Sequence, residues 1–451
     1  MKSRRTDKIR LGLFYWPGGN HIAGWRHPRS EDDGTFNVQT VARCAQIAER
    51  GKFDLFFLAD IVGLRPEQVE AQSMTARSSY MEPLTLLSAL AMVTEKIGLV
   101  ATATTTYNEP YHIARKFASL DLISGGRAGW NLVTSHNQAE AANFSSRQHM
   151  AHDDRYARAR EFGNVVKGLW NSWDENALVR DKTGGRYYDP DKVHFLNHEG
   201  EYFSVRGPLN VTRSPQGHPV IVQAGSSGPG RDLAASTAEV VFTAAENFDQ
   251  GVAFYSDLKK RMDDINRPRD HVAIMPGFYP VIGSTEEEAK RILAELQDMV
   301  TPTSGMYLLQ HLLGRDLSMY PLDEPLPELP PHDGAQGRTE VILRTAREKN
   351  LTLRQLYQEI AVARGHNMVV GTPEKIADEM ERWFLGHAAD GFNLLPPCFP
   401  WSLEDFVDQV VPILQKRGLF REDYEGTTLR DHIGLPVPGQ DRPVAPKALA
   451  G

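Results

Sequence analysis

The chain alternates short apolar runs, which are typical of buried strands, with longer segments that have the apolar periodicity of helices. Repeated strand–helix units favour a parallel sheet, and about eight of them suffice to close a (β/α)8 TIM barrel. An open, doubly wound sheet is the structural alternative. The expected strands cover residues 9–16, 53–58, 97–104, 127–133, 219–224, 240–244, 271–282 and 391–395.

Helices should lie between these strands, and two connections are longer than barrel loops require. Within a single domain of 1–451, we expect insertions at roughly 137–218 and 283–390, on the C-terminal rim of the strands. The proline-rich stretch 320–333 suits a lid. Prolines near the end predict an extended arm at roughly 418–451, packed against another subunit. The expected helices are 38–50, 84–94, 114–123, 154–170, 232–237, 252–265, 286–299, 376–385 and 403–414.

Composition restricts the class of protein. Hydrophobic residues make up 41% of the 451 residues, which is enough for a large ordinary core. The formal net charge is -8 and no basic stripe interleaves with aromatic residues, which argues against nucleic acid as a partner. Cys44 and Cys398 are too few for a disulfide framework and lack metal-ligand spacing. Because no signal-peptide core and no apolar run of about 20 residues is found, we expect a soluble cytoplasmic protein without a membrane partner.

Polar residues follow the ends of several predicted strands, where barrel enzymes bind their ligands. Asp60 follows one strand, Thr104 and Thr105 end another, and Asn131 and His136 flank the end of a third. The Asn131 amide must find hydrogen-bond partners within an apolar strand, either on a ligand or on a neighbouring backbone group. Taken singly, Asp60 could equally cap a helix, and threonine is simply a good strand residue. Together these side chains predict one site at the rim.

A phosphate site is predicted where the run Gln223-Ala224-Gly225-Ser226-Ser227-Gly228-Pro229 leads from a strand into a helix. Free N–H groups, the helix dipole and the two serine hydroxyls would attract an anion, although an ordinary strand–helix turn would contain similar residues. His152 and Tyr156, four residues apart at the start of another helix, share a face that could hold a phosphate or a ring, or that could face solvent.

The loop after the first strand carries His21, Arg26 and His27. The two histidines could bind a metal, but no carboxylate cluster lies near them in the sequence, so we expect no metal site. Three residues are candidates for contacts to an anionic substrate, namely His21, Arg26 and His136. Motifs of serine hydrolases and zinc proteases are absent, as is a dinucleotide-binding glycine fingerprint after the first strand. A bound cofactor is therefore the better carrier of chemistry, and the catalytic residues remain unassigned.

Longer motifs occur along nearly the whole chain: Glu49-Arg50-Gly51-Lys52-Phe53-Asp54, Phe57-Leu58-Ala59-Asp60, Pro110-Tyr111-His112-Ile113-Ala114-Arg115, Ser124-Gly125-Gly126-Arg127, Trp130-Asn131-Leu132-Val133-Thr134-Ser135, Arg155-Tyr156-Ala157-Arg158-Ala159, Leu169-Trp170-Asn171-Ser172-Trp173, Val205-Arg206-Gly207-Pro208-Leu209-Asn210-Val211, Gln223-Ala224-Gly225 and Asp405-Phe406-Val407-Asp408-Gln409-Val410-Val411-Pro412-Ile413-Leu414. Together they resemble flavin-dependent monooxygenases of the bacterial luciferase-like superfamily. The chain is most similar to the branch of nitrilotriacetate, EDTA and dibenzothiophene sulfone monooxygenases, and the last motif is most like the sulfone monooxygenase.

This resemblance implies an oxygenase that receives reduced FMN (FMNH2) from a separate NAD(P)H:flavin reductase and uses O2 to oxidise a small-molecule substrate, with cleavage of a C–N or C–S bond among the outcomes. The family turn after Gly225 often reads x-Ser-Pro-x-Gly, and the displaced Pro229 leaves Ser227 as the best phosphate ligand. By position, Asp60, Thr104, Thr105 and Asn131 would surround the isoalloxazine, and His152, Tyr156, Ser226 and Ser227 would hold the ribityl phosphate.

A homodimer or homotetramer is expected, since the predicted arm needs a neighbouring subunit. Three alternatives to the monooxygenase remain at this stage. They are a deazaflavin-dependent oxidoreductase of the same superfamily, a non-catalytic flavin-binding protein and a metal-dependent barrel hydrolase.

Overall fold

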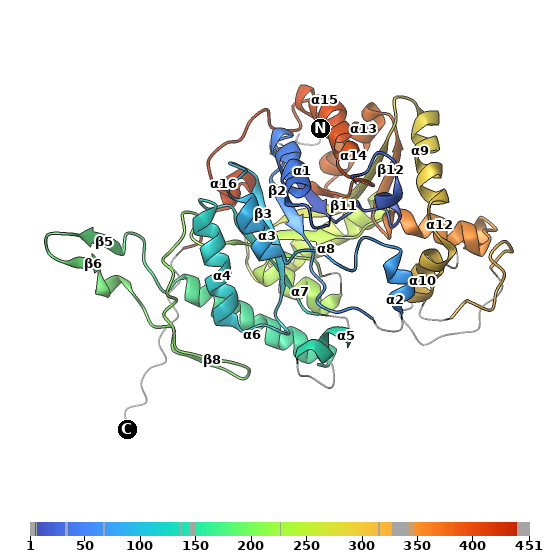
Figure 1. Ribbon diagram of the computed structural model, residues 1–451. Helices are drawn as coiled ribbons and strands as arrows, with labels where there is room; N and C mark the ends of the chain where they lie inside the picture. The colour runs from blue at the N-terminus through green and yellow to red at the C-terminus, as the bar shows by residue number, and fades with distance from the viewer. Residues whose placement is uncertain are drawn as a thin grey trace.

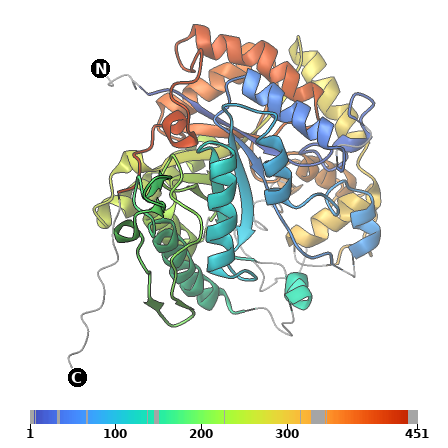
Figure 2. The same ribbon diagram turned by 60° about the vertical axis from the view of Figure 1, so that its left-hand side comes forward.

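The computed structural model describes residues 5, 7–31, 35–65, 68–135, 138–144, 150–225, 227–313, 316–326, 343 and 346–439. Eight parallel strands close into a barrel, because the last strand along the chain pairs with the first (Figure 1, Figure 2). The predicted (β/α)8 barrel is confirmed, and the open sheet is not formed. Around the barrel the strands are β1 (Arg10–Tyr15), β2 (Leu55–Leu58), β3 (Gly98–Thr104), β4 (Ala128–Val133), β9 (Val220–Gln223), β10 (Val240–Thr243), β11 (Ala273–Ile282) and β13 (Gly391–Leu394).

Helices cover the outside of the barrel (Figure 2). The side chain of Asn37 accepts hydrogen bonds from two backbone N–H groups and so begins the first helix, whereas Pro110 occupies the first turn of another. None of the helices in the described ranges combines the length and apolarity that a membrane span needs. The covering helices are α1 (Val38–Arg50), α3 (Pro83–Leu90), α4 (Pro110–Ile123), α6 (His152–Trp170), α7 (Gly228–Thr237), α8 (Phe248–Asp264), α13 (Pro373–Leu385) and the run of α14 (Trp401–Asp405) and α15 (Val411–Lys416), which a π-helical turn joins.

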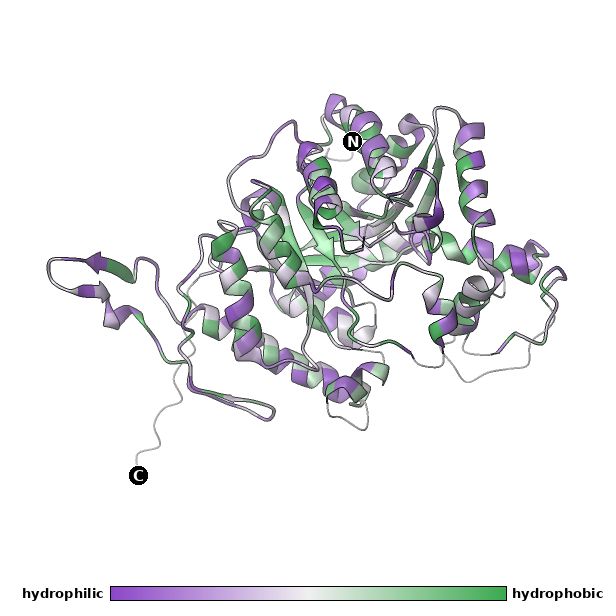
Figure 3. Ribbon diagram, in the orientation of Figure 1, coloured by the Kyte–Doolittle hydropathy of each residue, from purple (hydrophilic) through white to green (hydrophobic). Residues whose placement is uncertain are grey.

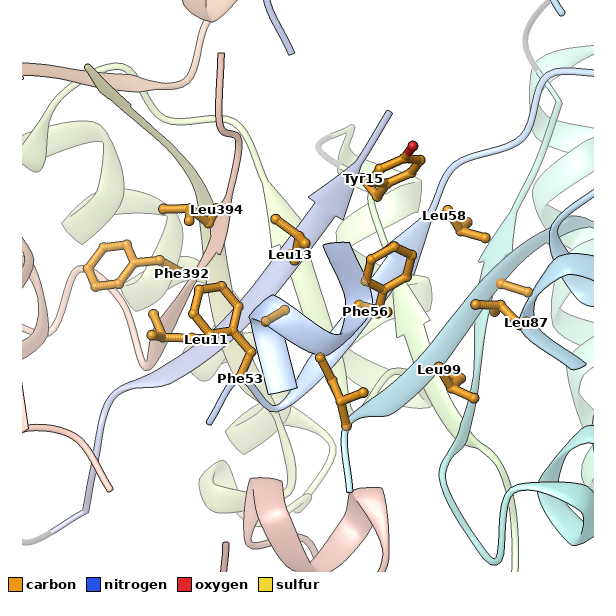
Figure 4. Close-up of a cluster of buried hydrophobic side chains, with 14 of the residues drawn as sticks. Leu11, Leu13, Tyr15, Phe53, Phe56, Leu58, Leu87, Leu99, Phe392 and Leu394 are labelled. Carbon is orange, nitrogen blue, oxygen red and sulfur yellow. The ribbon is translucent and has the colours of Figure 1, made fainter. Parts of the chain in front are cut away.

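Side chains alternate between the two faces of each strand, so the core has two parts. Outward-pointing residues of the strands pack against the helices, as Figure 4 shows for Leu11 and Leu13 on β1 and for Leu394 on β13. Inward-pointing residues such as Phe57 and Val100 fill the barrel itself. The barrel strands are accordingly apolar, whereas the helices expose polar residues to solvent (Figure 3). This arrangement leaves the carboxyl ends of the strands free to form a site.

Between β4 and β9, most of the additional chain begins after α6, later in the sequence than the predicted start at about residue 137. Helix α6 packs between α4 and α7 and so belongs to the covering ring. After α6, the segment 171–219 is additional to the strand–helix units, and one of its two hairpins projects far from the barrel (Figure 1). The hairpins are formed by β5 (Leu178–Asp181) with β6 (Arg186–Tyr188), and by β7 (His198–Glu199) with β8 (Ser204–Val205).

The connection between β11 and β13 contains elements that the sequence did not predict. Two of its helices pack against each other in a separate apolar cluster, which also includes Ile22 and Ala23 of the loop after β1. The strand within this connection pairs with residues 278–282 at the carboxyl end of β11, and it extends the barrel wall there. Of the predicted proline-rich lid at 320–333, only residues up to 326 are described. Helix α9 (Glu286–Asp298) agrees with the helix predicted at 286–299, whereas α10 (Pro302–Leu313), α12 (Leu353–Ala363) and β12 (Asn367–Gly371) were not predicted.

The segment 419–439 folds back beneath the amino-terminal ends of the strands, which corrects the predicted extended arm over this range. A short helix, α16 (Leu429–Ile433), lies there and begins with a capping box. Its apolar side chains join the core inside the barrel, and this burial outweighs the extended preference of the neighbouring prolines. Residues 440–451 of the predicted arm lie outside the described residues.

Helix α16 forms the floor of the barrel. The fully buried Leu429 lies where a side chain at position 98 would be, since a Cβ added to Gly98 would stand 2.4 Å from the Leu429 Cδ1 atom. The next residue, Arg430, is 0% exposed, and its Nη2 atom lies 3.1 Å from Oε2 of Glu239. The guanidinium also donates to the Pro436 carbonyl at 2.9 Å. A buried ion pair thus fixes the floor to the barrel wall.

We predict that Arg430→Ala lowers the free energy of unfolding by about 3 kcal/mol, because removal of one partner leaves the other charge of a buried pair uncompensated. Urea denaturation followed by circular dichroism measures the change. Arg291→Ala is the control, since Arg291 forms an exposed pair with Glu295 within one helix and such pairs contribute under about 1 kcal/mol. Equal losses in the two variants would contradict the structural role of Arg430.

Candidate active site

A pocket opens at the carboxyl ends of the barrel strands, with an empty volume of about 760 Å³ that includes its mouth. Residues from β1, β2, β3, β4, β9 and β10, or from the loops directly after them, contribute to its wall. The lining residues are Phe14, Trp16, Phe57, Ala59, Asp60, Ile61, Val62, Thr102, Thr104, Asn131, Val133, Thr134, Ser135, Glu140, Ala224 and Phe242.

The floor of the pocket is aromatic. The Phe14 ring stacks on Phe57 with centroids 5.2 Å apart and on Phe242 with centroids 5.6 Å apart. Trp16 continues the row, with its ring 6.0 Å from that of Phe14 and nearly parallel to it. A surface of this shape excludes water and suits a planar ring system.

Asn131 presents an unsatisfied acceptor to the pocket. Its side chain is 3% exposed, and its Nδ2 atom donates to the Thr102 hydroxyl at 2.8 Å. That hydroxyl donates in turn to the Leu58 carbonyl at 2.8 Å, so the orientation of the amide is fixed. The Asn131 Oδ1 atom is buried and has no hydrogen-bond partner among the described residues. An acceptor in this state costs stability unless a ligand N–H group meets it.

The threonines of β3 divide between two environments. Thr104 lines the pocket, and its hydroxyl accepts hydrogen bonds from the Thr106 N–H at 3.1 Å and from the Ser135 hydroxyl at 2.9 Å. Thr105, which the motif placed beside the same ring, is buried outside the pocket lining, with its hydroxyl directed to the Val133 carbonyl at 3.3 Å. Thr102 lines the pocket although sequence analysis missed it. Alternation along the strand would have found it, because residues 102 and 104 share a face.

Asp60 is a half-buried carboxyl at the edge of the pocket. Burial, together with the nearby carboxylates of Glu82 and Glu140, raises its pKa to about 7. Tyr80 fixes the adjoining backbone, since its hydroxyl accepts from the Ile61 N–H at 2.7 Å and donates to the Ile61 carbonyl at 3.0 Å. A carboxyl with a pKa near neutrality at the edge of a pocket is a candidate for proton transfer.

The start of α7 adjoins the pocket near Ala224. Ser227 caps α7, and its hydroxyl accepts from the Gly230 N–H at 3.2 Å and donates to the Tyr156 hydroxyl of α6 at 3.3 Å. A Cβ at Gly230 would lie 3.2 Å from that tyrosine oxygen, so the glycine keeps the space open. The structure thus brings Ser227 and Tyr156 together from distant parts of the sequence. The predicted contacts Ser226, His136 and the His152 side chain lie outside the described residues.

The two substrate candidates of the first loop do not line the pocket. His21 is buried, and its Nδ1 atom accepts from the Ala23 N–H at 3.2 Å. Arg26 is exposed and donates to the Met299 carbonyl, away from the pocket. His27 packs beside Trp401 with ring centroids 5.1 Å apart. Within the described ranges, no group of three His, Cys, Asp or Glu side chains is placed to hold a metal ion.

The fold and the pocket define a (β/α)8 barrel protein with a small-molecule pocket at the carboxyl ends of its strands. The chain belongs to the luciferase-like monooxygenase family, whose model matches residues 20–387. It is 51% identical over 437 residues to N-acetyl-S-(2-succino)cysteine monooxygenase of Bacillus subtilis (strain 168). The aligned region covers 96% of this chain and 98% of that protein. It is 52% identical over 442 residues to component A of nitrilotriacetate monooxygenase of Aminobacter aminovorans, again covering 96% and 98%.

Solved structures agree with this assignment. EDTA monooxygenase from Chelativorans sp. BNC1 superimposes with a TM-score of 0.81 at 36% identity, covering 95% of this chain and 99% of that one. Riboflavin lyase with modified FMN superimposes with a TM-score of 0.81 at 34% identity, covering 96% and 97%. An F420-dependent secondary alcohol dehydrogenase shares only the fold, with a TM-score of 0.55 at 14% identity over 89% and 98%. The family and branch predicted from the sequence motifs are confirmed.

We predict that Asp60 makes the protein less stable as the pH rises from about 4 to 7. An unfolded aspartate has a pKa near 4, whereas the folded Asp60 has a pKa of about 7, so unfolding releases a proton between these values. The resulting loss in the free energy of unfolding is absent below about pH 4 and complete above about pH 7, on the order of 1–3 kcal/mol. Asp60→Asn should remove it, and urea denaturation of both proteins across this range provides the measurement. Parallel pH profiles would show that Asp60 titrates normally.

Proposed function

We propose that this protein is the oxygenase component of a two-component system, which binds reduced FMN and uses O2 to oxidise a small organic substrate. The buried, unpartnered Oδ1 atom of Asn131 above a flat aromatic floor is the observation that carries this proposal. An acceptor in that place matches an N–H group on the edge of an isoalloxazine ring. The presence of modified FMN in the riboflavin lyase structure supports the same cofactor.

The residues present fit the two ends of FMN. The ring would lie against Phe14 and Phe57, with Asn131, Thr102 and Thr104 along its polar edge. The phosphate would lie at the start of α7, where the Ser227 and Tyr156 hydroxyls and the helix dipole would favour an anion. When bound, the reduced flavin supplies the electrons with which O2 is activated for transfer of one oxygen atom.

The side chains of the pocket have roles around that cofactor. The stacked rings of Phe14, Phe57 and Phe242 exclude water from the floor, which would keep solvent away from the reacting atoms. Asp60, with its raised pKa, can hold or release a proton at its carboxyl oxygen near neutral pH. We assign proton transfer at the pocket edge to this residue.

The comparisons favour this function over its alternatives. The deazaflavin-dependent protein shares only the fold at 14% identity, whereas the relatives above 50% identity are named monooxygenases. Both of those names describe oxidation of a molecule with carboxylate groups next to a C–N or C–S bond. We therefore propose that this chain oxidises a substrate of that kind at such a bond.

We further propose a source of the reduced FMN, a role for the second insertion and an oligomeric state. A separate NAD(P)H:flavin reductase would supply the reduced FMN in the cytoplasm, as the name "component A" of a relative suggests. The insertion 283–390 would form the wall of the substrate site through α10 and α12. The β5–β6 hairpin exposes Val179, Tyr187 and Tyr188, which favours a contact between subunits in a homodimer or homotetramer.

We predict that Ser227→Ala weakens FMN binding about tenfold or more, because a hydrogen bond to a charged phosphate contributes about 1.5–3 kcal/mol. Tyr156→Phe should change the affinity in the same direction. Titration of FMN fluorescence measures both. Ser236→Ala is the matched control, since that serine lies further along the same helix and bonds to its backbone. If the Ser227 and Ser236 variants bind FMN equally well, the phosphate lies elsewhere.

We predict that photochemically reduced FMN and O2 support a single turnover without any reductase, because the proposed FMN site needs only diffusible reduced flavin. Mass spectrometry of nitrilotriacetate or N-acetyl-S-(2-succino)cysteine after mixing detects the product. The control omits the protein. Product that forms only when a reductase is bound to this protein would contradict free diffusion of the flavin.

A further inference from the structure

Two polar groups of the pocket wall have no role in the cofactor site described above. They are the indole N–H of Trp16, in the loop after β1, and the carboxylate of Glu140, in the short helix α5 (Gln138–Ala141) that follows β4. Both side chains line the pocket, and they are 8% and 4% exposed. The Trp16 Nε1 atom and the Glu140 Oε2 atom are buried without a hydrogen-bond partner among the described residues. The pocket wall therefore holds one donor and one acceptor that a ligand can satisfy.

The loop after β2 connects these two side chains. The Trp16 ring meets the edge of the Tyr80 ring, with centroids 5.6 Å apart and ring planes at 60°. The Tyr80 hydroxyl in turn holds the Ile61 backbone through two hydrogen bonds. Two residues further along, the loop packs directly on α5, since a Cβ added to Gly63 would stand 2.9 Å from the Glu140 N atom. Trp16 and Glu140 thus lie around one short loop, which itself lines the pocket.

The Glu140 carboxylate has no cation to balance it. No lysine, arginine or histidine is among the described residues that line the pocket, and Glu140 forms no ion pair within the described chain. The other carboxyl of the wall belongs to Asp60, whose pKa is raised to about 7 by burial and by the charges of Glu82 and Glu140. A buried carboxylate without a counter-ion costs stability, and a ligand that brings a positive charge removes this cost.

The origin of Glu140 assigns it to the substrate rather than to the flavin ring. The stacked rings of the floor belong to strands β1, β2 and β10, whereas Glu140 comes from a helix beyond the carboxyl end of β4. A flavin lying on the floor would have Glu140 beside its opposite face, from which a substrate approaches. Asn131, the acceptor assigned to the ring edge, is by contrast a residue of strand β4 itself.

We propose that Glu140 binds a protonated amine of the substrate and that the Trp16 N–H binds one of its carboxylates, so that the protein selects aminocarboxylates over thioether carboxylates. This inference rests on the proposed monooxygenase function, and it narrows the substrate class from a C–N or C–S centre to a protonated C–N centre. An ammonium group donates charge-assisted hydrogen bonds, which are roughly twice as strong as neutral ones. A thioether sulfur carries no proton and would leave the Glu140 charge buried and unpaired.

Isothermal titration calorimetry at pH 7, on the protein with bound oxidised FMN, tests the proposal with a matched pair of probes. Iminodiacetate and thiodiacetate each carry two carboxylates on the same short frame, and they differ only in a protonated amine against a thioether. We expect the wild-type protein to bind iminodiacetate about tenfold or more tightly than thiodiacetate. Equal binding of the two probes, tighter binding of thiodiacetate, or no binding of either would overturn the proposal.

Two variants separate the two contacts. Glu140→Gln keeps the size of the side chain without its charge, and it should weaken iminodiacetate binding about tenfold without weakening thiodiacetate binding. Trp16→Phe keeps an aromatic ring without the N–H, and it should weaken both probes several-fold, because both present a carboxylate. Glu295→Gln, on the exposed side of α9, is the matched control and should change neither affinity. Full retention of the amine preference in Glu140→Gln would show that the amine binds elsewhere.

The affinity for FMN separates this inference from the proposed function. It should stay within about twofold of the wild-type value in Glu140→Gln, which also shows that the variant is folded. A loss of FMN affinity with an unchanged amine preference would instead assign Glu140 to the cofactor. If a variant fails to fold, the comparison of the two probes on the wild-type protein still decides the matter. Failure of the wild-type protein to bind FMN would refute the proposed function, whereas normal FMN binding without an amine preference would refute only the role of Glu140.

Discussion

Closure of the parallel sheet is the constraint on which the rest of the molecule depends. β1 pairs with β13 so that Leu13 lies opposite Leu394, and every barrel strand then has two neighbours and a fixed register. Fixed register decides which side chains point inward. The interior of the barrel therefore consists of three layers. From the amino-terminal to the carboxyl-terminal ends of the strands, they are the floor around Leu429, the aromatic layer around Phe14 and the polar rim around Asn131. The chemistry at the rim is therefore specified by the same alternation that fills the core.

Much of this architecture could be predicted, because strand and helix periodicities are local properties of the sequence. Each of the eight barrel strands was expected close to where it lies. Helices α10 and α12 were not expected, since their apolar faces pack on each other in a small separate cluster rather than on the barrel. Helix α16 was not expected because prolines follow it closely in the sequence. Its few apolar residues form part of the core only because the helix is buried beneath the strands.

The site was predictable where position along a strand determines the direction of a side chain. Asn131 was chosen because an amide in an apolar strand needs a partner, and its unpartnered Oδ1 atom shows that a ligand can supply one. The sequence motif places Thr105 beside the ring. Because side chains alternate between the two faces of β3, Thr102 and Thr104 line the pocket instead, and Thr105 points away from it. The support of the Asp60 loop by Tyr80 could not be predicted, since the Tyr80 hydroxyl reaches the Ile61 backbone only through the tertiary fold.

The position of α16 in the chain has a consequence for folding. Its residues complete the interior next to β2 and β3, although more than three hundred residues separate Leu429 from Gly98. Contacts of such long sequence separation form late and slow the folding of a domain. While the chain is being synthesised, the first strands must therefore wait with an open, apolar lower end until the last helix emerges. During this interval the nascent barrel is exposed to aggregation, because its floor is made long after the strands that rest on it.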